Sequence, residues 1–159
     1  MAELTNLKII PKFSIVRGDE FFRIFQFSMP HPDDPDGLDP ETYPPLPFDL
    51  TGFTQMLCDF RDKPDEAEGV CYVSLKDEDG LSVIGDDNDG LGMFISSAKS
   101  NEFKPNTTPH SYTTVVEGAR YLVTVDAVYY YDIRLLVNDS VRTWLTGTME
   151  VISNITKIE

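Results

Sequence analysis

The residue types that carry most enzyme chemistry are sparse in this sequence. A catalytic nucleophile needs a base within hydrogen-bond reach, and the only two histidines, His31 and His110, lie in proline-flanked segments. The chain has no Gly-x-Ser-x-Gly elbow, no Gly-x-x-x-x-Gly-Lys phosphate loop, no dinucleotide-binding glycine fingerprint and no His-Glu-x-x-His. Carboxylates are abundant, but they cluster in predicted turns, where Asp satisfies backbone groups. These patterns favour a protein that is not an enzyme, with no catalytic residue and no cofactor.

Three acidic loops offer the hard oxygen ligands that calcium prefers, and they end at Gly37, Gly80 and Gly90. An EF-hand loop carries acidic or amide residues one, three and five places before its glycine. Each loop has the first two of these residues. The residue five places before the glycine is instead, in chain order, Pro32, Leu75 and Gly85. We therefore predict no EF-hand metal site, and a weak calcium site of another kind is the open alternative.

The two cysteines, Cys58 and Cys71, fall in neighbouring predicted strands and could face each other there. Two buried thiols are the commoner state in a reducing cytoplasm, so a disulfide is the less favoured alternative. A metal site would need more ligands than this pair supplies.

The charge balance of the chain excludes several classes of partner. Its 27 acidic and 13 basic residues give a formal net charge of -14, which repels nucleic-acid phosphates and anionic membrane surfaces. The N-terminus lacks a basic segment followed by an apolar one, and no run of about eighteen apolar residues occurs. We expect no nucleic-acid partner, no membrane partner and no signal peptide. The length of 159 residues suits a single domain spanning 1–159.

Short alternating segments separated by turn residues predict an all-β protein. In the segment 21–27, for example, Phe21, Arg23, Phe25 and Phe27 share one face. The predicted strands are 7–16, 21–27, 54–61, 70–75, 81–84, 92–96, 121–137 and 141–152. A serine-capped helix of one or two turns is expected at 97–103. Seven or eight strands at this spacing are typical of an antiparallel sandwich or barrel.

The segment 30–47 contains seven of the eleven prolines and five acidic residues. Proline lacks an N–H donor, so we expect this segment to form no sheet ladder and no helix. It is predicted to be a long surface loop or arm, which either binds a partner or is a solvated excursion. We predict that it does not pack tightly within its own domain.

Several short motifs occur in a characteristic order along the chain. They are Arg17-Gly18-Asp19 before an aromatic strand, Asp49-Leu50-Thr51-Gly52-Phe53 before a strand ending at Phe60-Arg61, Tyr131-Asp132-Ile133-Arg134-Leu135 before a turn, and a closing segment 141–156 with Trp144, Leu145, Gly147 and Thr156. This order resembles the N-terminal domain of baseplate upper proteins, a domain found widely in bacteriophage structural proteins. The resemblance covers most of the chain, with 30–47 and 106–120 looking like insertions.

The resemblance implies an immunoglobulin-like antiparallel sandwich in a virion protein of the tail, baseplate, collar or capsid decoration. The implied partners are other virion proteins and further copies of the chain. In many relatives a fibre or receptor-binding region follows this domain, and here the sequence ends just after the closing motif, which favours a connector, collar or capsid-decoration role.

Two rival hypotheses remain open. A carbohydrate or host-receptor binder would use exposed aromatics such as Tyr43, Tyr112 and Tyr129, although each of these could equally pack in the core or under a loop. A glycan hydrolase would need two carboxyl groups facing each other across a cleft at about 5–9 Å.

Trp144, the only tryptophan, is a candidate interface residue together with Tyr43 and Tyr129. Regular alternation along the closing strand puts Leu145, Met149 and Val151 on the apolar inner face and Trp144 on the outer face. A lone exposed tryptophan is typical of assembly interfaces. The alternative is that residues 106–120 fold over it.

Overall fold

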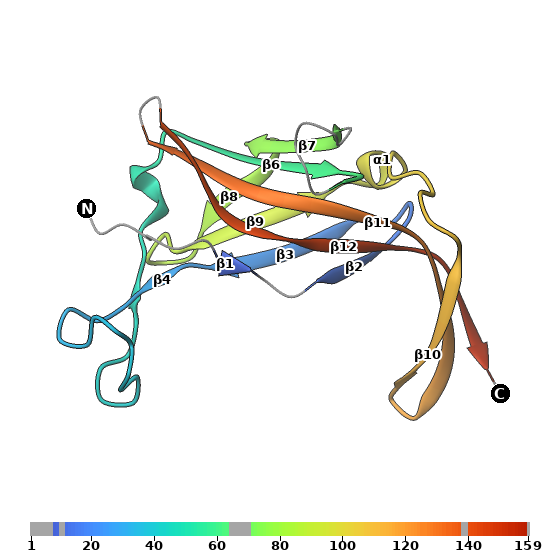
Figure 1. Cartoon of the computed structure of the whole chain (residues 1–159), viewed down its shortest axis with the longest axis horizontal. Coiled ribbons are helices and arrows are strands. Elements are labelled where there is room, and N and C mark those ends of the chain that lie inside the picture. Colours follow the sequence, from blue (N-terminus) through green and yellow to red (C-terminus); the bar gives the residue numbers. More distant parts are fainter. Residues whose placement is uncertain (1–7, 10–11, 64–70, 138–139, 159) are drawn as a thin grey trace.

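The computed structural model describes residues 8–9, 12–63, 71–137 and 140–158, and it is an all-β protein, as predicted (Figure 1). Twelve strands occur in these residues. They are β1 (Lys8–Ile9), β2 (Phe13–Val16), β3 (Phe21–Gln26), β4 (Ser28–Met29), β5 (Leu46–Pro47), β6 (Gln55–Arg61), β7 (Cys71–Asp77), β8 (Gly80–Ile84), β9 (Gly90–Ile95), β10 (His110–Val116), β11 (Ala119–Val137) and β12 (Ser140–Ile158). The helical elements described are a 3-10 turn, η1 (Leu50–Gly52), and the one-turn helix α1 (Ser97–Ser100).

Ten of these strands form one mixed sheet in the order β1-β12-β11-β6-β7-β8-β9-β3, with β10 beside β11 and β2 beside β12. The prediction of a purely antiparallel arrangement is wrong at three pairings. The short N-terminal strands β1 and β2 both run parallel to β12, and β7 meets β8 in a short parallel ladder. The alternation of apolar and polar residues along a strand cannot reveal these directions. It depends on which face of the strand is buried and not on the direction of the neighbouring strand.

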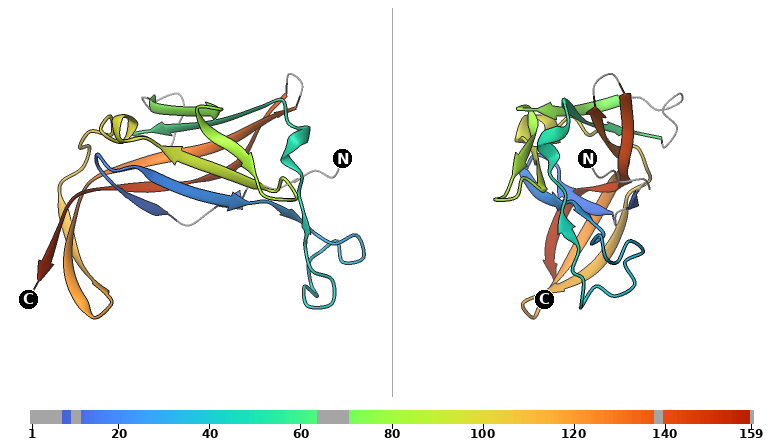
Figure 2. Two further views of the ribbon diagram at one scale, coloured as in Figure 1. Left: turned by 180° about the vertical axis from the view of Figure 1, so that it is seen from behind. Right: turned by 90° about the vertical axis from the view of Figure 1, so that its left-hand side faces the viewer.

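The sheet curls around its apolar face until its two ends meet (Figure 2). Phe13 in β2 stacks on Phe21 in β3 with ring centroids 4.9 Å apart, and Phe13 also contacts Tyr131 in β11. The interior is filled by one large cluster of buried side chains drawn from β2, β3, β6, β7, β8, β9, β11 and β12. The core therefore lies inside the curled sheet.

The predicted faces are correct in the strands with regular alternation. In β6, Met56, Cys58 and Phe60 are buried. In the segment starting at β3, Phe25 and Phe27 are buried, while the alternate residues of β3 face outward. The predicted hairpin of β6 and β7 also forms.

The pairing of β6 with β7 separates the two cysteines. Cys58 lies opposite Leu75, whereas Cys71 lies opposite Arg61. Three residues along a strand correspond to about 10 Å, which exceeds the Cα separation of a disulfide. The idea that the cysteines face each other is therefore wrong, and Cys58 is completely buried.

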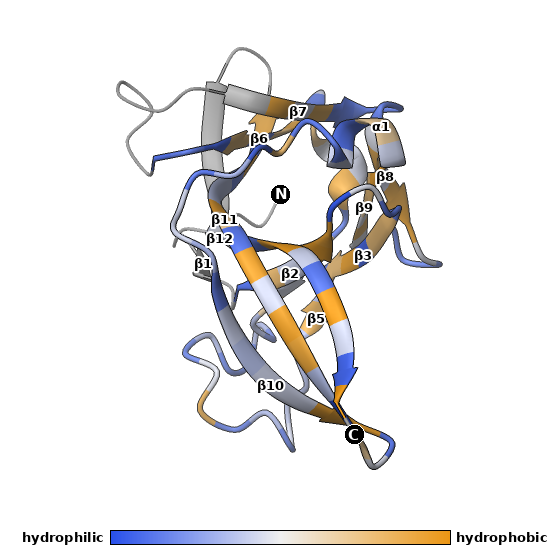
Figure 3. Ribbon diagram, turned by 90° about the vertical axis from the view of Figure 1, so that its right-hand side faces the viewer, coloured by the Kyte–Doolittle hydropathy of each residue, from blue (hydrophilic) through white to orange (hydrophobic). Residues whose placement is uncertain are grey.

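The two C-terminal strands extend well beyond the curled sheet and its core, which we call the body. β11 and β12 each have nineteen residues and pair along their whole length. Beyond the body their ends continue with β10 as a three-stranded extension, which we call the arm and define as residues 106–124 and 153–158 (Figures 1 and 3). Residues 106–120 were expected to be an insertion, and β10 was not predicted. The sequence of β10, His-Ser-Tyr-Thr-Thr-Val-Val, is nevertheless rich in strand-forming residues.

The Pro-rich segment 30–47 projects from the opposite end of the body, on the same side as the arm (Figure 1). Its base is closed by β4 and β5, where Ser28 pairs with Pro47 and Met29 with Leu46. The expectation that no part of 30–47 enters a ladder is thus wrong for its last two residues. Proline is tolerated there because a two-residue ladder leaves an edge that needs no further donor.

The close approach of Tyr131 in β11 to Gly147 in β12 allows the core packing to be tested. A Cβ atom at Gly147 would lie 2.7 Å from the hydroxyl oxygen of Tyr131, so Gly147→Ala forces a buried ring to shift. We expect a loss of about 2 kcal/mol in the free energy of unfolding, measured by urea denaturation. Tyr131→Phe removes the nearest atom and should restore part of that loss in the double variant. Equal stability of Gly147→Ala and the wild type would contradict the packing described.

Candidate functional site

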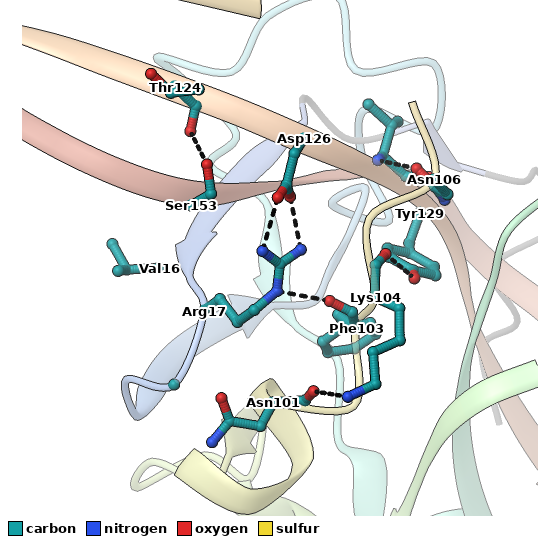
Figure 4. Close-up of polar contacts among 12 residues, drawn as sticks. Val16, Arg17, Asn101, Phe103, Lys104, Asn106, Thr124, Asp126, Tyr129 and Ser153 are labelled. Carbon is teal, nitrogen blue, oxygen red and sulfur yellow. Dashed lines mark hydrogen bonds and ion pairs between the residues drawn. The ribbon is translucent and has the colours of Figure 1, made fainter. Parts of the chain in front are cut away.

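The arm joins the body at an ion pair between the turn after β2 and the middle of β11 (Figure 4). The Arg17 guanidinium donates two hydrogen bonds to the Asp126 carboxylate, at 2.8 Å and 2.6 Å, and its Nε donates to the carbonyl oxygen of Phe103 at 2.8 Å. Both side chains are largely buried. The hydrogen bonds with Asp126 raise the pKa of Arg17 above its ordinary value, and a bidentate pair of this kind fixes both position and orientation.

Asp126 faces Arg17 because the ladder is irregular at this point. Val125 pairs with Ile152 and Ala127 pairs with Val151, so Asp126 has no opposite residue. On the other strand Ser153 is skipped, since Thr124 pairs with Asn154. Bulges bend a strand and redirect a side chain, so the bend into the arm and the aim of Asp126 have one origin.

The connection from α1 to β10 is attached to the same part of β11 (Figure 4). The Asn106 side chain donates to the carbonyl oxygen of Val128 at 2.8 Å and accepts from its N–H at 2.9 Å. The backbone N–H groups of Asn106 and Thr107 donate to the carbonyl oxygen of Asp126. These bonds replace a strand ladder just before β10 begins.

Tyr129 belongs to this attachment and not to an exposed surface. Its side chain is 0 % exposed, its ring packs against Phe103, and its hydroxyl donates to the carbonyl oxygen of Lys104 at 2.6 Å. The prediction that Tyr129 is an exposed interface aromatic is therefore wrong. It shares the inward face of β11 with Tyr131 and Ile133. Because residues two apart in a strand lie on the same face, the spacing of Tyr129, Tyr131 and Ile133 could have indicated that Tyr129 is buried.

The arm has exposed apolar side chains on both faces and almost no charge. Tyr112 is 41 % exposed and Val115 is 63 % exposed, and Val116, Leu122 and Ile155 are also exposed. The charged residues of the arm are Glu117, Arg120 and Lys157. The arm is thus close to neutral in a chain whose net charge is -14.

The Pro-rich segment 30–47 is organised by local hydrogen bonds. The Asp34 carboxylate accepts from the backbone N–H groups of Leu38 at 3.0 Å and Asp39 at 2.9 Å. The rings of His31 and Tyr43 lie 5.3 Å apart, and Tyr43 is 36 % exposed. Leu38 is the most exposed large apolar residue described. Tyr43 is therefore accessible, as predicted, on a segment that holds its shape mainly through its own contacts.

A third surface lies on the outside of β8, β9 and β3. Phe22 lies opposite Phe94, Ile24 opposite Gly92, and Gly90 between Gln26 and Ile84. We call this surface the outer apolar face. Its members are Phe22, Ile24, Gln26, Ser82, Ile84, Gly90, Gly92 and Phe94, with no charged residue among them. This surface was not predicted from the sequence.

The outside of β6 and β11 has the opposite character. Asp59 accepts hydrogen bonds from Ser74 at 2.6 Å, Arg61 at 3.2 Å and Arg134 at 2.6 Å. Arg134 also lies 3.4 Å from Asp132. This is a neutralised polar network, in which each cation lies beside a carboxylate.

The Trp144 side chain lies outside the described residues, so its surface position stays a prediction. That prediction rests on regular alternation along β12, and the backbone of β12 shows that the alternation is interrupted. Ile133 pairs with Leu145 and Arg134 pairs with Thr143, which leaves position 144 without an opposite residue. Regular alternation from Met149 therefore does not extend unbroken through Trp144.

Among the described residues, no three His, Cys, Asp or Glu side chains are grouped so that they could hold a metal ion. No helix in that part of the chain is long and apolar enough to cross a membrane. No family model matches the sequence, and no curated protein matches it either.

The ion pair at the base of the arm gives the first prediction from this geometry. Arg17→Ala leaves a largely buried carboxylate without its partner, so we expect a loss of about 2 kcal/mol in the free energy of unfolding. Hydrogen exchange in β10 should accelerate as well, because the bend is released. Asp126→Asn should add little to Arg17→Ala in the double variant.

The pair of Lys99 and Asp79, 3.0 Å apart, is the matched control, because the Asp79 side chain is 57 % exposed. Lys99→Ala should leave the thermal midpoint nearly unchanged, because ion pairs with an exposed carboxylate contribute little. Additive effects of Arg17→Ala and Asp126→Asn would contradict direct coupling between the two side chains.

The hydrogen bonds of Asp34 give the second prediction. Asp34→Ala should speed hydrogen exchange at the Leu38 and Asp39 amides by about fivefold, the equivalent of one lost hydrogen bond. The global unfolding midpoint should hardly change. Asp36→Ala, at an exposed position of the same segment, is the control, and an equal effect of both variants would refute the role of Asp34.

Proposed function

We propose that the chain is a non-enzymatic structural protein of a bacteriophage particle, an assembly or connector module of its tail, baseplate, collar or capsid decoration. One observation carries this proposal. The arm and the segment 30–47 project from opposite ends of the body on the same side, and both expose apolar side chains (Figure 2). Such projections are suited to holding a neighbouring protein.

The finer fold assignment, an immunoglobulin-like sandwich, is part of the proposal. In such sandwiches the third, sixth and seventh strands form one sheet, and the second, fifth and fourth strands belong to the other. We count β2, β3, β6, β8, β9, β11 and β12 as strands one to seven of such a sandwich. With this count, β6-β11-β12 corresponds to the third, sixth and seventh strands, and β3-β9-β8 corresponds to the second, fifth and fourth strands. The strand β7 is then an addition that joins the two sheets into one.

The contact of Tyr129 supports the same assignment. Immunoglobulin-like domains often carry a tyrosine near the start of the sixth strand, whose hydroxyl bonds to backbone just upstream. Tyr129 donates to the carbonyl oxygen of Lys104, and the residues between them contain the whole hairpin of β10 and β11. With that hairpin treated as an insertion, the donor and acceptor become close neighbours in sequence.

The residues that carry the family resemblance have structural roles consistent with it. Arg17 makes the ion pair at the base of the arm, and Gly18 has a positive φ of 89° in the turn before β3. Asp49 caps η1 by accepting from the N–H of Thr51. The pKa of Asp49 is lowered by its hydrogen bonds with Thr51.

The charge distribution supports partners that meet the two projections. Residues 30–47 contain five acidic residues and no Lys or Arg, whereas the arm has two basic residues and one acidic residue. The segment 30–47 therefore presents an acidic surface to a partner, whereas the arm presents a nearly neutral one. Other virion proteins, and further copies of the chain, are the partners that we propose.

A carbohydrate or receptor binder is the second candidate, because Tyr43 and Tyr112 are exposed on the two projections. Specific binding of the isolated chain to a glycan array, lost in Tyr43→Ala or Tyr112→Ala, would favour this candidate over an assembly role.

The experiment that tests the proposed function locates the chain on particles. Particles purified from a lysate of the host that carries the gene should contain the chain in several copies, detected by mass spectrometry and by antibody labelling in electron micrographs. We expect Val115→Lys combined with Val116→Lys to reduce its incorporation at least tenfold, because two charges enter a desolvated contact.

Ser97→Lys combined with Ala98→Lys, at exposed positions of α1, adds the same charge outside both projections and serves as the control. Purified particles that lack the wild-type chain would overturn the proposed function. Equal incorporation of both double variants would refute the role of the arm.

A further inference from the structure

The outer apolar face of β8, β9 and β3 is a surface that the proposed roles of the two projections do not use. Phe22 is 56 % exposed, Ile24 is 49 % exposed and Phe94 is 40 % exposed. These three side chains are neighbours across the β3–β9 ladder, so they form one continuous patch. Contiguous exposed apolar patches on a folded protein commonly mark interaction sites.

Two glycines of β9 make this patch low and flat. A Cβ atom at Gly92 would lie 3.3 Å from the Phe22 ring, and one at Gly90 would lie 3.0 Å from the Ile84 side chain and 3.4 Å from that of Ile24. Without side chains at these positions, Phe22, Ile24 and Ile84 lie over the backbone of β9. The result is a broad apolar surface, of the kind that can pack against another flat sheet.

The absence of charge on this face removes the main obstacle to contact between two copies of an acidic chain. The chain has 27 acidic and 13 basic residues, yet the eight residues of the face include neither kind. In a contact between two copies related by a two-fold axis, each surface meets itself, so any net charge on it is opposed by the same charge. A partner chosen by charge would instead need charged residues on this face, and its eight members include none.

We propose that the outer apolar face packs against the same face of a second copy of this chain, with Phe22, Ile24 and Phe94 at the centre of the contact. This inference rests on the proposed function in one respect, namely that several copies meet on one particle. The face spans three strands, about 10 Å, and a stable interface usually needs about 800 Å² from each partner. The isolated dimer is therefore weak, and repeated contacts on a particle would reinforce it.

The test measures self-association of the whole chain by sedimentation equilibrium at protein concentrations up to about 100 μM. We expect the wild type to form a dimer in this range. Phe22→Glu combined with Ile24→Glu should weaken the dimer at least about 100-fold, because like charges would meet across the two-fold axis. Both positions are exposed in the monomer, and an unchanged circular dichroism spectrum and thermal midpoint would verify folding.

The matched control is Ser97→Glu combined with Ala98→Glu, which adds the same two charges at exposed positions of α1, outside the outer apolar face and the arm. This control should leave the dissociation constant within about threefold of the wild type, apart from the general effect of two added charges. A second measurement uses salt. Screening reduces repulsion between the acidic bodies, so raising the ionic strength from about 0.05 M to about 0.5 M should strengthen the dimer.

Three results would overturn the proposal. They are a monomeric wild type at the highest concentration, a dimer unaffected by Phe22→Glu combined with Ile24→Glu, and a dimer weakened equally by the α1 control. A dimer that dissociates as salt is added would also contradict it, since that behaviour indicates contact between opposite charges. These outcomes concern the isolated chain, so they are separate from the detection of the chain on particles, which tests the proposed function.

Discussion

The length of the β11–β12 ladder is the constraint on which the rest of the structure depends. Nineteen residues in a strand extend about 60 Å, whereas strands in globular proteins usually have five or six residues. The curled sheet can cover only part of such a ladder. The part between Ala127 and Leu135 lies on the core, where the inward side chains of β11 are fully or almost fully buried. The remainder must continue beyond the core, and with β10 it becomes the arm.

The transition from body to arm depends on an irregular ladder and one ion pair. A regular ladder would continue straight, with alternate side chains on opposite faces. Instead, Asp126 and Ser153 are skipped in the pairing, and the buried run of Val125, Asp126 and Ala127 departs from alternation. A bulge alone would leave the carboxylate of Asp126 near the core without compensation. Arg17 provides that compensation from the turn after β2, so the direction of the arm is tied to the N-terminal part of the fold.

The sequence predicts the parts of this structure in which local pattern and burial agree. Met56, Cys58 and Phe60 alternate regularly and are buried, and Ser96 caps a single helical turn as a serine in that place should. It cannot predict the parallel pairing of β2 with β12, because neither strand carries a local mark of its neighbour's direction. Tyr129 was assigned to the surface although it shares the parity of Tyr131. The cross-strand positions of Cys58 and Cys71 depend on a register that only the folded sheet defines.

The two outer faces of the sheet differ in how their charges are balanced. On β6 and β11, carboxylates lie beside arginines, so that side is polar and internally balanced, with little charge left for a partner. On β3 and β9 the same strand geometry carries Phe22, Ile24 and Phe94 with no charge to balance. The excess of acidic residues lies mainly in turns and in the segment 30–47. Repulsion between copies is therefore strongest at those loops and weakest at the arm and the outer apolar face, which are the surfaces with apolar area to bury. In the assembly role that we propose, this arrangement would keep copies apart in dilute solution and let them associate on a particle, because the apolar contact gains from proximity while the acidic loops can remain in water.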